Sequence, residues 1–192
     1  MNKNSVKLLT LFACIFSLLI LLAFKEAQSE GVRYNSDEAK FEMKFGRKYN
    51  YDNIAVKRVV DGDTLLLESG DRVRLIGIDT PEVHESAKLH RDAERSGQDK
   101  KKIQEMGKRA ADFTKSLVGG KRVRLEFDVE RKDKYGRLLA YVYLVDDGAF
   151  VNAKIVEEGY ASLMTYPPNV KYADEFVKLY REARENNRGL WK

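Results

Sequence analysis

Acidic and basic residues gather at three places where a predicted strand ends. These are Asp61–Thr64 (DGDT), Asp79–Glu82 (DTPE) with Arg74 shortly before it, and Asp133–Arg137 (DKYGR). Each segment has a plain structural interpretation, respectively an Asp-Gly hairpin turn, a helix start at proline and a glycine turn. Together, however, they bring three candidate site carboxylates (Asp63, Asp79 and Glu82) and two arginines to one small domain. Phosphodiester hydrolysis needs such a set, because it requires a cation, a base for water and donors for the charge on phosphate.

The acidic residues of the first two segments suit a hard metal ion. Asp63 stands where the second predicted strand begins, so its carboxylate can point inward, and Asp79 and Glu82 offer further oxygens. The turn before proline also exposes the backbone carbonyl of Thr80. Oxygen ligands of this kind suit Ca²⁺, which accepts irregular geometry and completes its shell with water. The sequence therefore predicts a calcium site.

The basic residues suit a phosphate group. Arg137 follows Tyr135 at a strand terminus, and Arg74 lies in the preceding part of the domain. A guanidinium stays protonated and binds two phosphate oxygens at once. The sequence therefore predicts a phosphate-binding pair of arginines beside the acidic residues.

The elements that must position these side chains are mainly strands. Alternating polar and apolar residues, bounded by turn signals, predict strands at 54–60, 64–67, 72–78, 121–127 and 138–144. Helical spacing of apolar residues predicts helices at 106–118, 151–158 and 172–186. Five strands with one helix between the third and fourth predict an OB-fold five-stranded barrel with about three helices. The fold class is α+β, mainly β.

The third predicted strand has to bend. Arg74 and Asp79 are five positions apart, so a regular strand would place their side chains on opposite faces. For both to line one site, the strand must bend or bulge between them. Gly77 is the residue best suited to permit that bend.

Segment 83–105 is highly charged and lacks a clear apolar stripe, so we interpret it as a long loop. It holds both histidines, His84 and His90, whose spacing matches no known ligand pattern for a second metal. A solvated charged loop is the favoured interpretation. Its lysines at 100–102 either contact substrate phosphates or simply face water.

The N-terminus differs from the rest of the chain. Two lysines precede 17 uncharged residues at 8–24, and Ala27-x-Ser29 follows. This pattern predicts a cleaved signal peptide at 1–29, or alternatively a membrane anchor through residues 8–24. Residues 30–50 are a predicted linker and residues 51–192 a single domain. Either version places the domain outside the cytoplasm, secreted, periplasmic or anchored.

Composition limits the interpretation further. Removing residues 1–29 takes away three Lys and one Glu and leaves 32 basic and 29 acidic residues, a net charge of +3. This mild excess permits a polyanionic partner without requiring one. Cys14, the single cysteine, lies in the N-terminal segment, so the domain must be stable without disulfides.

The three segments resemble the staphylococcal nuclease family. The resemblance rests on Asp61–Thr64, on Arg74–Glu82 and on Asp133–Tyr143, in this order and at compatible spacings. It continues through Val151-Asn152 and Gly159 to Gly189–Trp191 and covers about residues 52–192. It implies the fold described above and a calcium-dependent nuclease.

The resemblance also implies roles for the acidic residues. Asp63 and Asp79 would bind Ca²⁺ directly, and the Thr80 carbonyl would be a further ligand. Glu82 would orient or deprotonate the attacking water.

The resemblance implies that Arg74 and Arg137 hold the scissile phosphate and stabilise the transition state. Lys134 and Tyr135 would hold a neighbouring phosphate. Tyr166 matches the region that stacks on bases.

One departure from the family pattern is Met164, which stands where a second aromatic residue is common. Stacking on bases is therefore expected to be weaker or to rely on Tyr166 alone. The expected substrates are DNA and RNA, cleaved with little base preference to leave 3′-phosphate ends, and the expected state is a monomer. The alternative is a non-catalytic nucleic-acid-binding or interaction module on the same barrel.

Overall fold

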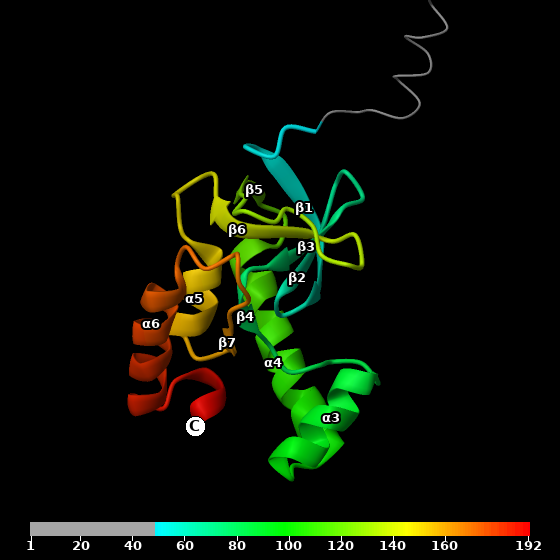
Figure 1. Cartoon of the computed structure of the whole chain (residues 1–192), viewed down its shortest axis with the longest axis vertical. Helices are drawn as coiled ribbons and strands as arrows, with labels where there is room; N and C mark the ends of the chain where they lie inside the picture. The colour runs from blue at the N-terminus through cyan, green and yellow to red at the C-terminus, as the bar shows by residue number, and fades with distance from the viewer. Residues whose placement is uncertain (1–48) are drawn as a thin grey trace, which may run out of the picture. The chain divides into compact units, whose positions relative to one another are not determined.

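Five strands close into a barrel in the order β1-β2-β3-β6-β5 (Figure 1). The computed structural model describes residues 49–192, so the predicted signal or anchor and nearly all of the predicted linker lie outside the described residues. The barrel strands are β1 (Ile54–Asp61), β2 (Thr64–Leu67), β3 (Arg72–Leu75), β5 (Arg122–Glu126) and β6 (Leu138–Leu144).

The strand pairing confirms the predicted OB-type barrel. β1, β2 and β3 form an antiparallel meander, β5 pairs antiparallel with both β1 and β6, and β3 pairs parallel with β6. The β3–β6 pair closes the barrel and places β3 beside the first residues of β6, with Val73 opposite Leu138 and Leu75 opposite Ala140. Charged segments from distant parts of the sequence are therefore brought to neighbouring strand ends.

The third predicted strand is divided in two, and the predicted bend is confirmed. β3 ends at Leu75, and β4 (Gly77–Asp79) leaves the barrel to pair antiparallel with β7 (Ser162–Met164). Gly77 has φ of 83°, which favours glycine, and its Cα lies against the ring of Phe176. The buried side chain of Asn152 donates to the carbonyl of Ile76 at 2.9 Å and accepts from the N–H of Val142 at 3.0 Å. These contacts fix the bend.

Four α-helices lie within residues 49–192, rather than about three. They are α3 (Ala87–Ser96), α4 (Lys100–Val118), α5 (Val151–Glu157) and α6 (Ala173–Glu185), and a short 3₁₀ helix, η1 (Gly189–Trp191), follows. The positions of α5 and α6 agree with the predictions to within one residue.

The interpretation of 83–105 as a long loop is wrong, because α3 and the first turns of α4 occupy most of it. Capping residues define these helices. Ser86 accepts from the N–H of Leu89, Gly97 ends α3 with φ of 67°, and Asp99 accepts from the N–H of Lys101. Leu89 is the one fully buried residue of α3, so no apolar stripe marks this helix in the sequence.

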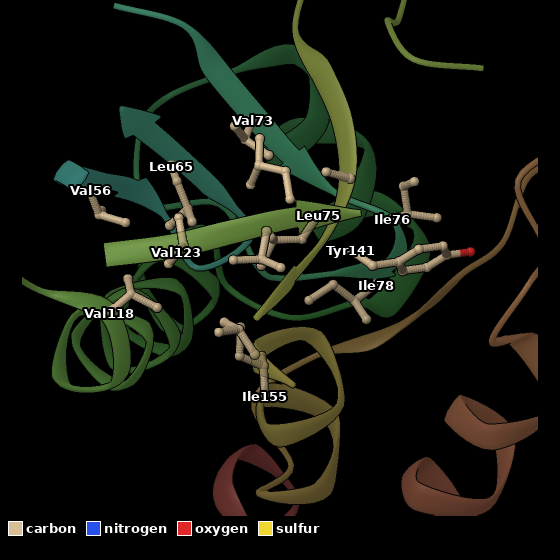
Figure 2. Close-up of a cluster of buried hydrophobic side chains, with 14 of the residues drawn as sticks. Val56, Leu65, Val73, Leu75, Ile76, Ile78, Val118, Val123, Tyr141 and Ile155 are labelled. Atoms are coloured by element: carbon tan, nitrogen blue, oxygen red, sulfur yellow. The ribbon is translucent and has the colours of Figure 1, made fainter. Parts of the chain in front are cut away.

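Apolar side chains from the strands fill the barrel, as Figure 2 shows. α4 contributes Val118 to this core and α5 contributes Ile155. Each such side chain stabilises the fold by roughly 1.5–3 kcal/mol when it leaves water. The charged strand ends are thus attached to a well-packed support. No helix within residues 49–192 has the length and apolar character needed to cross a membrane.

Candidate active site

Four carboxylates, here called the acidic cluster, come together at the ends of β1 and β4. They are Asp61, Asp63, Asp79 and Glu82. Asp63 is 4% exposed, and its Oδ2 accepts from the Thr80 N–H at 2.8 Å and the Thr80 hydroxyl at 3.0 Å. These bonds join the β1–β2 turn to the segment that follows β4. The charged segments at 61–64 and 79–82 are therefore joined by hydrogen bonds.

Two glycines allow the surrounding backbone to approach this closely. Gly62 does not have a positive φ, so the Asp-Gly turn does not need glycine for a left-handed backbone conformation. A Cβ at Gly62 would instead lie 2.8 Å from Thr80 and 3.0 Å from Ala110. A Cβ at Gly107, in the middle of α4, would lie 2.6 Å from the carbonyl oxygens of Pro81 and Glu82. The helix can thus lie directly against the acidic segment.

Arg74 lies between two of the carboxylates. It forms an ion pair with Asp63 and a second with Asp79, where Nη2 and Oδ1 are 2.7 Å apart. Its side chain is 13% exposed. Burial lowers the pKa of the Arg74 guanidinium while Asp79 raises it, and an arginine remains protonated at neutral pH under either influence. The bend at Gly77 brings this side chain to Asp79.

Lys88, from the first turn of α3, is a residue of this site that the sequence analysis missed. Its Nζ lies 2.9 Å from Asp79 Oδ1, 3.1 Å from Glu82 Oε1 and 2.8 Å from the carbonyl oxygen of Thr80. Ser86 was the available sequence signal, because a serine cap predicts a helix that begins at residue 87. Lys88 would then lie in the first turn of a helix shortly after the acidic segment.

Asp61 is a second residue that the sequence analysis left without a role. Burial raises the pKa of its carboxyl group and Glu82 raises it further, whereas His84, Lys88 and Arg74 oppose the shift. Its Oδ1 is buried without a hydrogen-bond partner. Its position at the end of β1, two residues before Asp63 in the same tight turn, was the available signal.

The chemistry of the acidic cluster fits a divalent cation. Its four carboxylates face two basic groups, Arg74 and Lys88, which leaves an excess of two negative charges. The oxygens around the Lys88 ammonium are hard ligands of the kind that Ca²⁺ accepts. Among residues 49–192, no group of three His, Cys, Asp or Glu side chains is arranged to hold a metal as it stands. Arg74 and Lys88 bind several of the carboxylate oxygens.

Beyond Arg74 the site opens into a groove of about 610 Å³. We call it the arginine–tyrosine groove, and its polar and aromatic lining includes Arg74, Lys134, Tyr135, Arg137 and Tyr166. Tyr135 and Tyr166 are 73% and 69% exposed. Met164 also lines the groove, at the position where the family pattern commonly has a second aromatic residue. The groove thus joins cationic and aromatic groups.

The turn before β6 holds Arg137 in place. Gly136 has φ of 79°, as the turn interpretation predicted. Asp133 accepts from the backbone N–H groups of Tyr135 and Arg137 and from Arg137 Nε at 2.7 Å. Burial tends to raise the pKa of Asp133, but the bonds from Arg137 outweigh it and lower the pKa. Asp133 is therefore an ionised support for this arginine.

A buried amide attaches the Tyr166 loop to the same region. Asn169 accepts from the N–H of Glu130 and donates to its carbonyl, both at 2.9 Å. Both histidines are exposed. His90 pairs with Glu85 at 2.6 Å on the surface, where the two side chains are 47% and 62% exposed, and His84 is also exposed.

The barrel, the acidic cluster and the adjoining groove define a class of OB-barrel protein in which carboxylates lie beside cationic and aromatic side chains. Comparison with known proteins agrees with this class. Residues 72–192 match the family model described as staphylococcal nuclease homologue. The thermonuclease of Staphylococcus intermedius is 40% identical over 144 residues, which cover 73% of this chain and 77% of the relative.

Two further relatives extend the comparison. The thermonuclease of Staphylococcus hyicus is 31% identical over 163 residues, covering 83% of this chain and 88% of the relative. An uncharacterised protein of Methanocaldococcus jannaschii is 34% identical over 196 residues, covering 96% of this chain and 94% of the relative. The chain belongs to the staphylococcal nuclease family. Membership of this family supports the identification of the protein as a nuclease.

Proposed function

We propose that the protein is an exported, calcium-dependent nuclease that hydrolyses phosphodiester bonds of DNA and RNA. The observation that carries the proposal is the position of Arg74, which contacts Asp63 and Asp79 and also lines the groove that contains Arg137. Carboxylates for a cation and guanidinium groups for a phosphate therefore adjoin one another. Family membership supports the same reaction.

In this proposal Asp63, Asp79 and the Thr80 carbonyl hold Ca²⁺. When bound, the ion supplies a positive charge that stabilises negative charge on the phosphate. The excess negative charge of the acidic cluster and its hard oxygen atoms support this assignment. The unpartnered Oδ1 of Asp61 adds a further acceptor beside these ligands.

Glu82 is the proposed base. Its carboxylate lies beside Asp79, where Lys88 contacts both groups, and its side chain is 23% exposed, so water can reach it. In this position it accepts a proton from the water that attacks phosphorus, or orients that water by a hydrogen bond. The phosphorus–oxygen bond to the 5′-oxygen then breaks, which leaves a 3′-phosphate.

Arg74 and Arg137 are the proposed phosphate ligands. Both are aligned by carboxylates, Arg74 by Asp79 and Arg137 by Asp133, each at 2.7 Å. Such alignment limits the reorganisation needed when charge develops on the phosphate oxygens. Lys134 and Tyr135 line the same groove, which supports the proposal that they hold a neighbouring phosphate.

The exposed ring of Tyr166 is the proposed stacking surface for a base. Stacking tolerates any base, which supports activity on both DNA and RNA with little sequence preference. The composition of residues 1–29 supports export by a signal peptide or a membrane anchor. Mass spectrometry of the mature protein tests this part, since cleavage would leave Glu30 as the first residue.

The decisive experiment incubates the purified full-length chain with single- and double-stranded DNA and RNA, with Ca²⁺ or with a chelator. We expect cleavage of all four substrates with Ca²⁺ and none with chelator. No cleavage with Ca²⁺, or equal cleavage under chelation, contradicts the proposal. Binding without cleavage would instead support a non-catalytic module. Analysis of the product ends tests the 3′-phosphate assignment.

A further inference from the structure

The Lys88 ammonium lies where the proposed metal ligands meet. Three oxygens surround its Nζ, namely Asp79 Oδ1 at 2.9 Å, the Thr80 carbonyl at 2.8 Å and Glu82 Oε1 at 3.1 Å. Two of these belong to residues proposed to bind Ca²⁺, and the third belongs to the proposed base. One ammonium therefore makes the contacts expected of a bound cation.

These contacts are sheltered from solvent. The side chains of Lys88 and Glu82 are each 23% exposed, and that of Asp79 is 16% exposed. Ion pairs in such surroundings are screened less than surface pairs. Lys88 therefore compensates the repulsion between the Asp79 and Glu82 carboxylates.

We propose that Lys88 is a built-in counter-cation that sets the affinity of the metal site, so that Ca²⁺ binds by displacing the Lys88 ammonium. This inference rests on the proposed calcium site and adds a residue that competes with the metal. An ammonium and a divalent ion cannot share the Asp79 oxygen and the Thr80 carbonyl at bonding distance. Metal binding is consequently an exchange of one cation for another.

The surrounding structure allows this exchange without unfolding α3. The helix is fixed by its Ser86 cap, by Gly97 at its end and by the buried Leu89, so its backbone can stay in place. The four-carbon stem of Lys88 is flexible, which lets the ammonium turn away alone. Asp92 lies one turn further along the same helix face and offers an alternative partner.

The test uses Lys88→Met, which keeps an unbranched side chain only one heavy atom shorter and removes the charge. Isothermal titration of the full-length protein with Ca²⁺ alone measures the dissociation constant. We expect Lys88→Met to bind Ca²⁺ at least about tenfold more tightly than the wild type, since no ammonium has to be displaced. Lys102→Met is the matched control, because it removes the same charge from an exposed position of α4. Its dissociation constant should stay within about twofold of the wild type.

Thermal unfolding gives a second, independent readout. Without Ca²⁺, Lys88→Met should unfold at a lower temperature than the wild type, because Asp79 and Glu82 repel each other. With saturating Ca²⁺ the variant should gain more stability than the wild type does. A merely structural lysine would lower both unfolding temperatures and would not tighten calcium binding.

The outcomes separate this inference from the proposed function. Equal or weaker calcium binding by Lys88→Met, with normal binding by the wild type, overturns the role of Lys88 and leaves the calcium site standing. Absence of calcium binding in the wild type and in both variants overturns the calcium site and this inference together.

Discussion

The acidic cluster and the arginine–tyrosine groove meet at Arg74 but are built differently. The side chains of Asp63 in the acidic cluster and of the adjoining Arg74 are 6% and 13% exposed, and their polar atoms bind other protein groups. In the groove, Tyr135 and Tyr166 are 73% and 69% exposed. The first region is held by the protein, whereas the second faces solvent.

This difference matches the two tasks of a nuclease site. Groups that take part in the chemical step must be held in position before the substrate arrives, because rearranging them during the reaction would slow it. Groups that bind a long, variable polymer can stay exposed, because stacking and phosphate contacts tolerate small shifts. Substitutions in the acidic cluster and at the two arginines should therefore change turnover, and substitutions of the exposed tyrosines of the groove should change substrate affinity.

The largest effect is expected from Arg74→Lys and Glu82→Gln. Each should lower kcat by at least about 100-fold, because the first loses bidentate phosphate binding and the second loses the base. Steady-state cleavage assays measure the effect. Arg72→Lys is the matched control, since Arg72 is exposed on the same strand. A near-normal kcat for either variant would remove the residue from its proposed role.

The next effect concerns the bend that supports the acidic cluster. Gly77→Ala should lower the free energy of unfolding by about 2–3 kcal/mol, because a Cβ there meets the Phe176 ring and φ is 83°. Gly70→Ala separates the two causes, since Gly70 has φ of 90° with nothing within 4 Å of a Cβ. It should cost only about 1 kcal/mol. Urea unfolding measures both, and equal losses would show that contact with Phe176 is unimportant.

A smaller effect is expected in the groove. Tyr166→Ala should raise KM by about tenfold and leave kcat within about twofold, because it removes one stacking surface. Tyr166→Phe keeps the ring and should resemble the wild type. The comparison of the two regions fails if Tyr166→Ala lowers kcat and leaves KM unchanged.

The smallest effect concerns the surface support of the Tyr166 loop. Glu126 accepts from Lys171 Nζ at 2.6 Å and from the Tyr172 hydroxyl at 3.0 Å. Burial tends to raise the pKa of Glu126, but these bonds lower it below its ordinary 4.5. A lowered pKa means that the contribution to stability is present above pH 4.5 and is lost as the pH falls through the folded-state pKa.

Glu126→Gln should therefore remove less than about 1 kcal/mol at neutral pH and make stability less dependent on pH in the acid range. Urea unfolding at several pH values tests this prediction. An unchanged acid dependence would exclude Glu126 as its source.

The fold and the separate ingredients of the site could be predicted because they depend on local patterns. Alternation marked the strands, and the five-residue separation of Arg74 and Asp79 required a bend at Gly77. Lys88 could not be placed in the same way, because α3 is defined by caps and one buried leucine rather than by an apolar stripe. Gly62 lies in the predicted turn, but close packing requires it there and a positive φ does not. The sequence could not show this, because the close neighbours Thr80 and Ala110 come from distant parts of the chain.

The bend between β3 and β4 has a consequence for protein synthesis. Contacts that hold it come from later in the chain: Asn152 binds the carbonyl of Ile76, and β7, at Ser162–Met164, pairs with β4. A ribosome-bound chain that already carries Arg74 and Asp79 lacks these contacts until Met164 has left the exit tunnel. The nascent chain therefore cannot fix this bend, or the site that depends on it, until β7 has emerged from the ribosome.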